Sequence, residues 1–304
     1  MKSFTVLSFN TWKCEGDYLA RLESMVTEIT LIEPDVILLQ EVFVSCNGEW
    51  DTAAYLAKRL SLNYVFHPAR RKKRIVLGNN LESESGLAIL AKREIIEHGA
   101  IELPTTPKDP SRWLQFAKLG FGSKNIVLMN THLTHLNDDK RTRFKQSLKI
   151  LGVIDNVSAG CPFILGGDFN ADPDDSVIKL LADKKKTPLS RIAMNRSTLR
   201  DHDRCIDHIF ISDLFLPVSS TRVLDGSQSS GFSPSDHYGV LAKLRFLQRC
   251  KNRTRNKKHA KARPRTRAAR QHERRQRKAA AVVVSPPSTM RCISGWPLYS
   301  SGSK

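Results

Sequence analysis

Two hydrophobic periodicities alternate along the first 246 residues of this 304-residue chain. Short, almost continuously apolar runs such as Phe4–Phe9 and Val36–Leu39 are typical of buried strands. Between these two runs, apolar residues recur every three or four positions from 17 to 33, which predicts an amphipathic helix that ends before Pro34. Segments of both kinds follow one another as far as Phe246. This alternation favours an α/β or mixed α+β layered fold and excludes an all-helical one.

The same criteria locate the remaining elements of the body. Further helices are predicted over 52–60, over 139–157 and from about residue 174 onward. Further strands are predicted at 63–67, 86–91, 113–120, 125–131, 163–165, 206–211 and 240–246. The body is therefore expected to be rich in strands.

The composition changes abruptly after Phe246. Residues 249–304 hold 17 of the 49 basic residues but one of the 30 acidic residues, a net charge of +16, so residues 1–248 are nearly neutral. A segment this basic repels itself and buries too little apolar surface to offset its ordering entropy. We therefore predict a catalytic domain over 1–248 and a disordered tail over 249–304. The tail is expected to bind a polyanion, either nucleic acid or an anionic membrane surface.

The six cysteines lie far apart and include no Cys-x-x-Cys pair, so neither a zinc site nor a redox dithiol is indicated. They are expected to be buried thiols in a reducing compartment. The apolar run at the N-terminus is too short for a signal peptide, and no run reaches the length of a transmembrane segment. These features predict an intracellular monomer, cytoplasmic or, in a eukaryote, nuclear.

Polar residues with catalytic potential stand at the ends of the predicted strands, where side chains leave a sheet and functional sites form. Taken one at a time, each has an ordinary structural explanation. Glu41 could belong to an ion pair, and Asp168–Asn170 could be an Asx turn before a helix. Their joint occurrence is what indicates a site. The set comprises Asn10, Glu41, His132, Asp168, Asn170, Asp207, Asp236 and His237.

This set is rich in oxygen ligands and contains no suitably placed cysteine or serine nucleophile. Carboxylate and amide oxygens select Mg²⁺ or Mn²⁺ rather than zinc. A hard divalent ion, a base for water and imidazoles that stabilise negative charge are the requirements for hydrolysing a phosphoester. The residues therefore predict Mg²⁺ as the cofactor, with Mn²⁺ as the alternative.

Motifs in the body resemble, in the same order, those of the endonuclease/exonuclease/phosphatase superfamily. They are Phe9-Asn10-Thr11-Trp12, Leu39-Gln40-Glu41-Val42, Asn130-Thr131-His132-Leu133, Gly167-Asp168-Phe169-Asn170, Ile206-Asp207-His208 and Ser235-Asp236-His237. The resemblance covers essentially the whole body. It implies a deoxyribonuclease-like four-layer sandwich, in which two facing β-sheets are flanked by helices and the site lies at one end.

The resemblance also implies roles for the metal-binding and water-activating residues. Glu41 is expected to bind the metal, with Asn10 beside it and Asp236 as a further ligand or an indirect partner. Asp168 would position or deprotonate the attacking water. Asn170 would donate to the phosphate and hold that geometry.

The histidines complete the implied site. His237, oriented by Asp207, would either stabilise the transition state as an imidazolium or transfer a proton. His132 matches the position that is histidine in deoxyribonucleases and sphingomyelinases and usually tyrosine in apurinic endonucleases. Glu84 is a candidate for the acid that pairs with His132, and an exposed loop acid is the alternative.

The substrate stays open among several classes. Leu39–Val42 and Pro234–Tyr238 are similar to phosphodiesterases that remove tyrosine from DNA 5′ ends, so we expect hydrolysis of phosphodiester bonds in nucleic acid. A sphingomyelinase or an inositol-phosphate phosphatase of the same fold is the alternative, although the sequence shows no evident apolar hairpin for membrane insertion. A non-catalytic polyanion-binding protein on this scaffold should have lost a key residue, and none is missing.

The body also contains one basic run, Arg70-Arg71-Lys72-Lys73-Arg74. We expect it to lie in a loop between two predicted strands. Such a loop is either solvated or, if it borders the site, contacts phosphates in a salt-dependent way without recognising bases.

Overall fold

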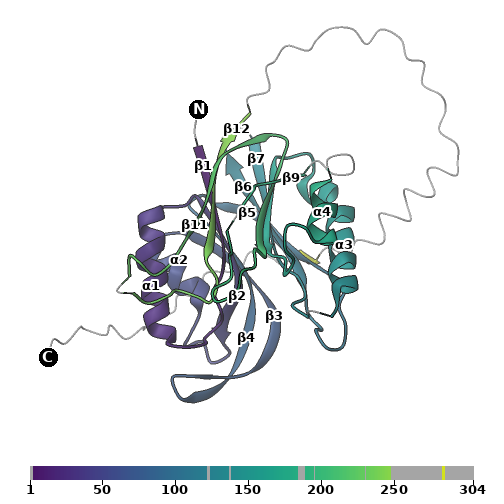
Figure 1. The fold of residues 1–304 in the computed structure, drawn as a ribbon. Helices are drawn as coiled ribbons and strands as arrows, with labels where there is room; N and C mark the ends of the chain where they lie inside the picture. Colours follow the sequence, from purple (N-terminus) through teal and green to yellow (C-terminus); the bar gives the residue numbers. More distant parts are fainter. Residues whose placement is uncertain are drawn as a thin grey trace, which may run out of the picture.

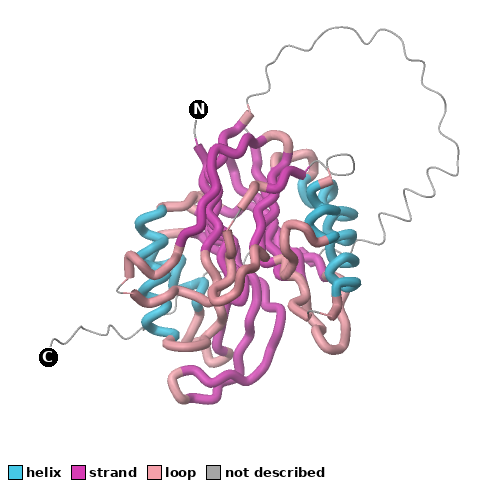
Figure 2. The backbone as a smooth tube through the Cα atoms, viewed as in Figure 1, coloured by secondary structure: helices cyan, strands magenta, loops and turns pink. Residues whose placement is uncertain are grey.

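A computed structural model of the chain describes residues 3–121, 124–136, 138–183, 189–194, 196–229 and 231–247, together with Val283–Val284. Two β-sheets face each other in the middle of the molecule (Figures 1 and 2). Helices α1 (Tyr18–Ile32) and α2 (Thr52–Leu60) cover one sheet, and α3 (Lys140–Ser158) and α4 (Ser176–Ala182) cover the other. The predicted four-layer sandwich is therefore confirmed.

The strands of the first sheet are β1 (Ser3–Asn10), β2 (Val36–Ser45), β3 (Asn63–Val76), β4 (Asn79–Ala91), β11 (Phe215–Val223) and β12 (Gly239–Phe246). Those of the second are β5 (Ile95–Glu102), β6 (Trp113–Phe121), β7 (Lys124–His132), β8 (Phe163–Asp168), β9 (Leu189–Arg191), β10 (Asp207–Ser212) and β13 (Val283–Val284). Their orders are β11-β12-β1-β2-β4-β3 and β13-β5-β6-β7-β8-β10-β9.

Each sheet contains one parallel pair, β1 with β2 and β7 with β8, and the other pairs are antiparallel. The carboxyl ends of parallel strands lie at the same edge of a sheet. This places Asn10 beside Gln40 in the first sheet and His132 beside Asp168 in the second. Both sheets thus deliver polar residues to one end of the sandwich.

Three apolar layers separate the four structural layers. In β2, Val36 and Leu38 pack between the two sheets, whereas Ile37 and Leu39 pack under α1 and α2. Successive strand residues point to opposite faces, so a strand that is buried on both faces must be apolar at every position. This explains the unbroken apolar run that identifies the strand in the sequence.

Helix α1 occupies the segment predicted from 17 to 33. Asp17 caps its first turn by accepting a hydrogen bond from the Ala20 amide over 3.1 Å. At the other end Glu33 adopts a left-handed conformation with φ 48°, and Pro34 follows. The three later helices also lie within about two residues of their predicted bounds.

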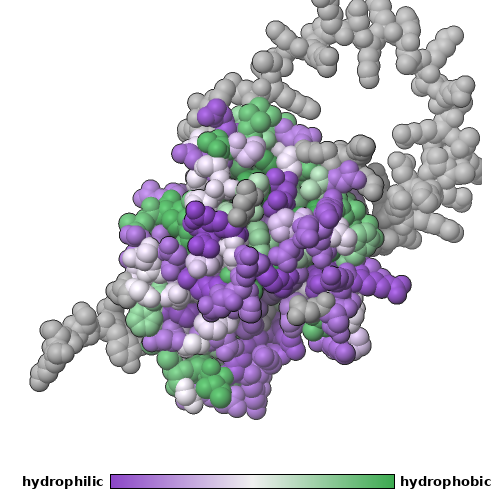
Figure 3. Space-filling model, in the orientation of Figure 1, coloured by the Kyte–Doolittle hydropathy of each residue, from purple (hydrophilic) through white to green (hydrophobic). Residues whose placement is uncertain are grey.

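The basic run is not in a loop, and here the sequence-based prediction was wrong. Arg70–Arg74 belongs to β3, which forms a long hairpin with β4 that extends away from the body (Figure 1). Five consecutive charges conceal the alternation that normally identifies a strand. The end of this hairpin exposes two apolar side chains, since Ile75 and Leu77 are 72% and 50% exposed. Figure 3 shows the apolar tip beside a hydrophilic surface.

The predicted tail lies outside the described residues, except for β13, which pairs with Gly99 and Ala100 of β5. Its disorder and the boundary near Arg249 therefore stay predictions. Cys14 is buried as predicted, but Cys46 is exposed. Within the described ranges, we find no helix with the length and apolarity required to cross a membrane.

Candidate active site

The predicted site residues converge on one cavity of about 380 Å³ where strands of both sheets begin or end. Seven of the eight line it, and the eighth, Asp207, is fully buried behind His237. The seven are Asn10, Glu41, His132, Asp168, Asn170, Asp236 and His237. The two sheets therefore build one site from residues that are far apart in the sequence.

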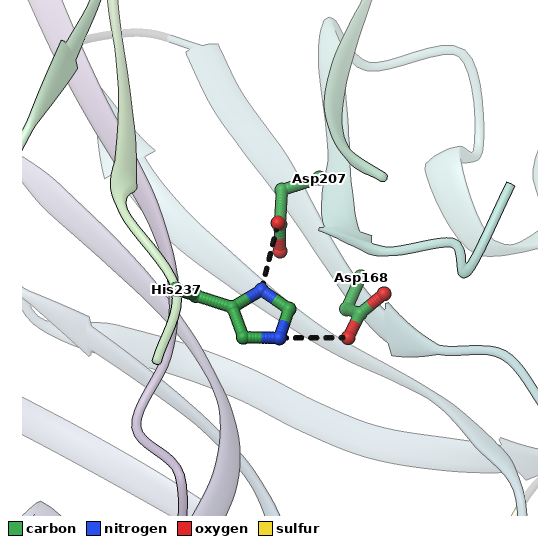
Figure 4. A group of neighbouring side chains, drawn as sticks. All are labelled: Asp168, Asp207 and His237. Atoms are coloured by element: carbon green, nitrogen blue, oxygen red, sulfur yellow. Dashed lines mark hydrogen bonds and ion pairs between the residues drawn. The ribbon is translucent and has the colours of Figure 1, made fainter. Parts of the chain in front are cut away.

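His237 and Asp207 form a buried pair at the back of the cavity (Figure 4). His237 Nδ1 donates a hydrogen bond to Asp207 Oδ2 over 2.9 Å. Burial disfavours the imidazolium, but the carboxylates of Asp207, Asp168 and Asp236 outweigh it and raise the pKa of His237 to about 10. His237 is therefore positively charged at neutral pH, and its Nε2 lies 3.9 Å from Asp168 Oδ2.

Asp168 accepts hydrogen bonds from two other residues of the predicted site. Its Oδ1 accepts a hydrogen bond from the Asn170 amide over 2.9 Å, and its Oδ2 accepts one from Asn10 Nδ2 over 3.1 Å. Burial, reinforced by the charge of Asp207, raises the pKa of Asp168 to about 7. A carboxyl group with this pKa gains and loses a proton near neutral pH.

Glu41 lies in a β-bulge. The register of β2 against β4 shifts between Leu39 and Val42, and Glu41 has a φ of 54°, in the left-handed region. Bulges and left-handed non-glycine residues cost free energy and concentrate at functional sites, where they direct a side chain. The Glu41 carboxylate forms an ion pair with Lys13, a cavity residue that sequence reasoning missed.

The loop that carries Asp236 and His237 is tied to β1. Ser235 Oγ donates to the Asn10 carbonyl over 2.7 Å and accepts from the His237 amide over 3.1 Å. Arg200 holds the same loop from the other side, since its amide donates to the Asp236 carbonyl and its Nε to the Ser235 carbonyl, both over 2.7 Å. No pattern in the sequence indicates this role for Arg200.

A buried polar link joins the sheets directly beneath the cavity. Asn130 of β7 donates through Nδ2 to the carbonyls of Leu39 (2.8 Å) and Ala88 (3.0 Å) in the opposite sheet. Its Oδ1 accepts from Gln40 Nε2 over 2.8 Å. Gln40 and Asn130 thus hold the sheets in register next to Glu41 and do not line the cavity. Two residues of the recognised motifs are therefore structural.

His132 lies beside Asp168, with its Nε2 3.5 Å from Asp168 Oδ2. Burial and the charge of Arg112 lower the pKa of His132 well below its ordinary value, so it is neutral. Glu84, the candidate partner for His132, faces Arg71 across the hairpin and does not line the cavity. In the described part of the chain, no ion pair joins Glu84 to His132.

His208 belongs to the core and not to the site. Its Nε2 donates to the Ala171 carbonyl over 2.9 Å, and its ring packs against Phe169 and Phe210. Burial lowers the pKa of His208 to about 4. The Ile206-Asp207-His208 motif therefore supplies one residue to the site and one to the core.

Several cations also line the cavity, and sequence reasoning assigned none of them to the site individually. They are Lys13, Arg70, Lys72, Arg74, Arg112 and Arg204. Arg112 donates to the His132 carbonyl over 3.3 Å and pairs with Asp109 at 2.8 Å. The cavity thus combines carboxylates with cations, and groups of these two charges suit a metal ion and a phosphate.

Comparison with known proteins identifies the family. The family model described as the Endonuclease/Exonuclease/phosphatase family matches residues 7–237, which include every predicted site residue. The chain belongs to the endonuclease/exonuclease/phosphatase family. This confirms the sequence-based recognition, and the predicted class, a hydrolase of phosphoester bonds, is the class of enzyme that the family comprises.

Individual members of the endonuclease/exonuclease/phosphatase family match more distantly. Protein angel of Drosophila melanogaster is 28% identical over 54% of this chain and 47% of its own length. Tyrosyl-DNA phosphodiesterase 2 of Xenopus laevis is 26% identical over 54% of this chain and 40% of its own length. The chain therefore spans less than half the length of these two relatives.

A solved structure shows the same fold. The catalytic domain of human Nocturnin with a bound sulfate anion superimposes with a TM-score of 0.65 at 23% identity. The match covers 81% of this chain and 95% of that one. At this identity the likeness establishes the architecture of the endonuclease/exonuclease/phosphatase family in this chain.

Proposed function

We propose that the protein is a Mg²⁺-dependent phosphoesterase that hydrolyses phosphodiester bonds in nucleic acid. The observation that carries the proposal is the cavity itself. A charged His237, an Asp168 with a pKa of about 7 and the carboxylate of Glu41 all face one space. Acid, base and metal ligand are thus arranged around a volume large enough for a phosphate group and its neighbours.

Three residues of the cavity offer oxygen ligands that suit a divalent metal ion, which on binding to Glu41 would displace the Lys13 ammonium group. Glu41, Asp236 and Asn10 line the same cavity, and Asn10 is the last residue of β1. The side-chain oxygen of Asn10 accepts a hydrogen bond from the Trp12 amide over 3.0 Å and keeps a second lone pair for a metal ion. An all-oxygen set of this kind suits Mg²⁺, with Mn²⁺ as a substitute. When bound, such an ion supplies Lewis-acid stabilisation of negative charge on phosphate oxygens. The strained backbone of Glu41 independently supports a directed role for its carboxylate.

An alternative grouping is less suited to a metal. Ligand atoms of Asp168, Asp207 and His237 lie within 4.8 Å of one another. However, the Asp207 carboxylate already accepts the hydrogen bond from His237 Nδ1, and an imidazolium repels a cation. We therefore assign these three residues to the chemistry of the water and the phosphate.

The proposed mechanism follows from the protonation states. Asp168, once ionised, removes a proton from water or orients it for attack on phosphorus. As the new P–O bond forms, the bond from phosphorus to the leaving oxygen breaks, and the leaving alkoxide takes a proton from solvent. His237 donates a charged hydrogen bond from Nε2 to a phosphate oxygen as negative charge accumulates there, and Asp207 keeps the imidazole charged and oriented. Asn170 donates through Nδ2 to the Leu133 carbonyl, which fixes the side chain beside the phosphate position. Neutral His132 can add a further hydrogen bond.

A nucleic-acid substrate is supported by the relatives and by charge. One relative, tyrosyl-DNA phosphodiesterase 2, is by its name an enzyme that acts on a phosphodiester of DNA. In this chain the cavity is bordered by cations on the hairpin side, and residues 249–304 add a net charge of +16. A basic surface next to the reacting centre favours a polyanion over a small neutral ester.

One observation favours a second candidate. The exposed Ile75 and Leu77 at the end of the β3–β4 hairpin, next to basic residues, would suit contact with an anionic membrane, and thus a phospholipid phosphodiester as substrate. A panel separates the classes: single- and double-stranded DNA, RNA, a 5′-tyrosyl oligonucleotide, sphingomyelin vesicles and inositol phosphates. Preferred turnover of sphingomyelin would replace the nucleic-acid assignment.

The test of the site uses three single substitutions. We predict that Glu41→Ala, Asp168→Ala and His237→Ala each abolish Mg²⁺-dependent hydrolysis of a phosphodiester, a loss of at least about 100-fold. Glu84→Ala is the matched control, because this acid lies on β4 outside the cavity. Folding of each variant is checked by circular dichroism. Full activity in all three variants would refute the site, and a wild-type protein that only binds polyanions would refute catalysis.

A further inference from the structure

The β3–β4 hairpin has two faces with opposite charge balance. Across the hairpin, Arg71 pairs in register with Glu84, and Lys73 pairs with Glu82. Glu82 also forms ion pairs with both Arg71 and Lys73, at 3.7 and 3.9 Å. Directly opposed residues of an antiparallel pair point to the same face. On this outer face, therefore, two acids neutralise two bases.

The other face points into the active-site cavity and is not neutralised. Arg70 pairs in register with Ser85, and Lys72 pairs with Ser83, so each cation lies opposite a small neutral side chain. Arg70, Lys72 and Arg74 all line the cavity. Within the described residues, none of the three forms an ion pair. The alternation of Glu82-Ser83-Glu84-Ser85 thus neutralises the outer face and leaves the inner face with three positive charges.

Arg74 supplies a second, independent observation. Its side chain is 6% exposed, and its terminal nitrogens donate to Ser83 Oγ (2.8 Å) and Ser85 Oγ (2.7 Å). Its Nε is buried without a hydrogen-bond partner in the part of the chain that the structure describes. Glu41 and Glu15 act on Arg74 electrostatically, but no acid among the described residues forms an ion pair with it. A buried guanidinium that is held by hydroxyl groups and has no ion-pair partner is costly unless an anion compensates it. The arrangement is that of a preorganised anion site.

We propose that the inner face of β3, formed by Arg70, Lys72 and Arg74, binds a phosphate of a nucleic-acid strand adjacent to the phosphate that is hydrolysed. The inference rests on the proposed function, and it extends that function from a single reacting phosphate to a strand that runs from the catalytic residues along the hairpin. Alternate residues of a strand repeat at about 6.7 Å, similar to the separation of successive phosphates in an extended polynucleotide. The contacts are electrostatic and do not recognise bases.

The hairpin provides its own matched control. Arg70→Gln/Lys72→Gln removes two charges from the inner face, and Arg71→Gln/Lys73→Gln removes two from the outer face of the same strand. All four side chains are exposed, so both double variants should fold. Each is compared with the wild-type full-length chain on a single-stranded oligonucleotide and on bis(p-nitrophenyl) phosphate, which contains one phosphate. Binding of a labelled oligonucleotide is measured in parallel by fluorescence anisotropy in EDTA.

The inner-face variant should raise both the KM and the Kd for the oligonucleotide on the order of ten-fold. It should also lower the slope of log Kd against log salt by about 1.4, at about 0.7 for each lost contact with a single strand. Hydrolysis of bis(p-nitrophenyl) phosphate should fall by a clearly smaller factor than hydrolysis of the oligonucleotide, because the small substrate has no second phosphate for the inner face to bind. The outer-face variant should bind the oligonucleotide within about two-fold of wild type, as expected for exposed ion pairs.

Three outcomes would overturn the proposal. Equal losses in the two variants would mean that total charge, and not the inner face, governs binding. An equal loss on bis(p-nitrophenyl) phosphate would place the residues at the reacting phosphate. Lost binding to phosphatidylserine vesicles with unchanged oligonucleotide binding would assign the face to a membrane. If the wild-type protein hydrolyses nothing, the proposed function fails, whereas the anisotropy comparison still tests the face.

Discussion

The buried link between the sheets gives the sharpest prediction of stability. Asn130→Ala removes three hydrogen bonds, to the Leu39 carbonyl, the Ala88 carbonyl and Gln40 Nε2. Each is worth about 1 kcal/mol net, so the free energy of unfolding should fall by roughly 3 kcal/mol. A typical domain has about 5–15 kcal/mol in total. The variant should therefore unfold at clearly lower urea concentration.

Gln115→Ala is the matched control for this prediction. Gln115 is also buried between the sheets, but its side chain makes one hydrogen bond to the described residues, from Nε2 to the Val65 carbonyl over 3.1 Å. Its Oε1 has no partner among the described residues, so truncation should cost roughly 1 kcal/mol. Urea unfolding followed by circular dichroism measures both variants. Because glutamine is the larger side chain, a loss for Gln115→Ala as large as that for Asn130→Ala would show that lost packing, and not hydrogen bonding, sets the cost.

Two further predictions concern pH and the tail. The pKa of His208 is about 4 in the folded protein and 6.5 ordinarily. Between these pH values the unfolded state binds more protons than the folded state. The free energy of unfolding should therefore fall by about 3 kcal/mol from pH 7 to pH 4. His208→Gln should remove this part of the decline, and an unchanged pH profile of unfolding would contradict it. Deletion of 249–304 should leave hydrolysis of bis(p-nitrophenyl) phosphate intact and weaken salt-sensitive binding of nucleic acid; unchanged affinity would exclude the tail from recognition.

Much of the fold was predictable because the core strands are buried on both faces. Continuous apolar runs identified β1, β2, β8 and β10 directly. Strands with exposed faces were missed. β11 has a mostly exposed pattern and contains Pro217, and β5 includes exposed Glu97, so neither shows the apolar signal of a central strand.

The convergence of the candidate site residues on one cavity was predictable to the extent that they stand at strand ends. Asp168 is the last residue of β8, and Asp207 is the first residue of β10. These strands are antiparallel neighbours, so the two residues lie directly opposite each other. Lys13, Arg74 and Arg200 could not be found in this way. Lys13 lies in a left-handed turn, Arg74 is placed by the register of a hairpin, and Arg200 acts through a loop contact. Local periodicity in the sequence encodes none of these features.

The central position of β1 in its sheet determines when, during synthesis of the chain, the site becomes complete. β1 lies between β2 and β12, and Ser235 bonds to Asn10 across 225 residues of sequence. A chain whose synthesis stops before Ser235 would contain Glu41 and Asp168 but lack His237, and one edge of β1 would be unpaired. On the proposed roles, such a fragment could not cleave nucleic acid. On these roles, activity requires synthesis to continue through His237, near the end of the catalytic body.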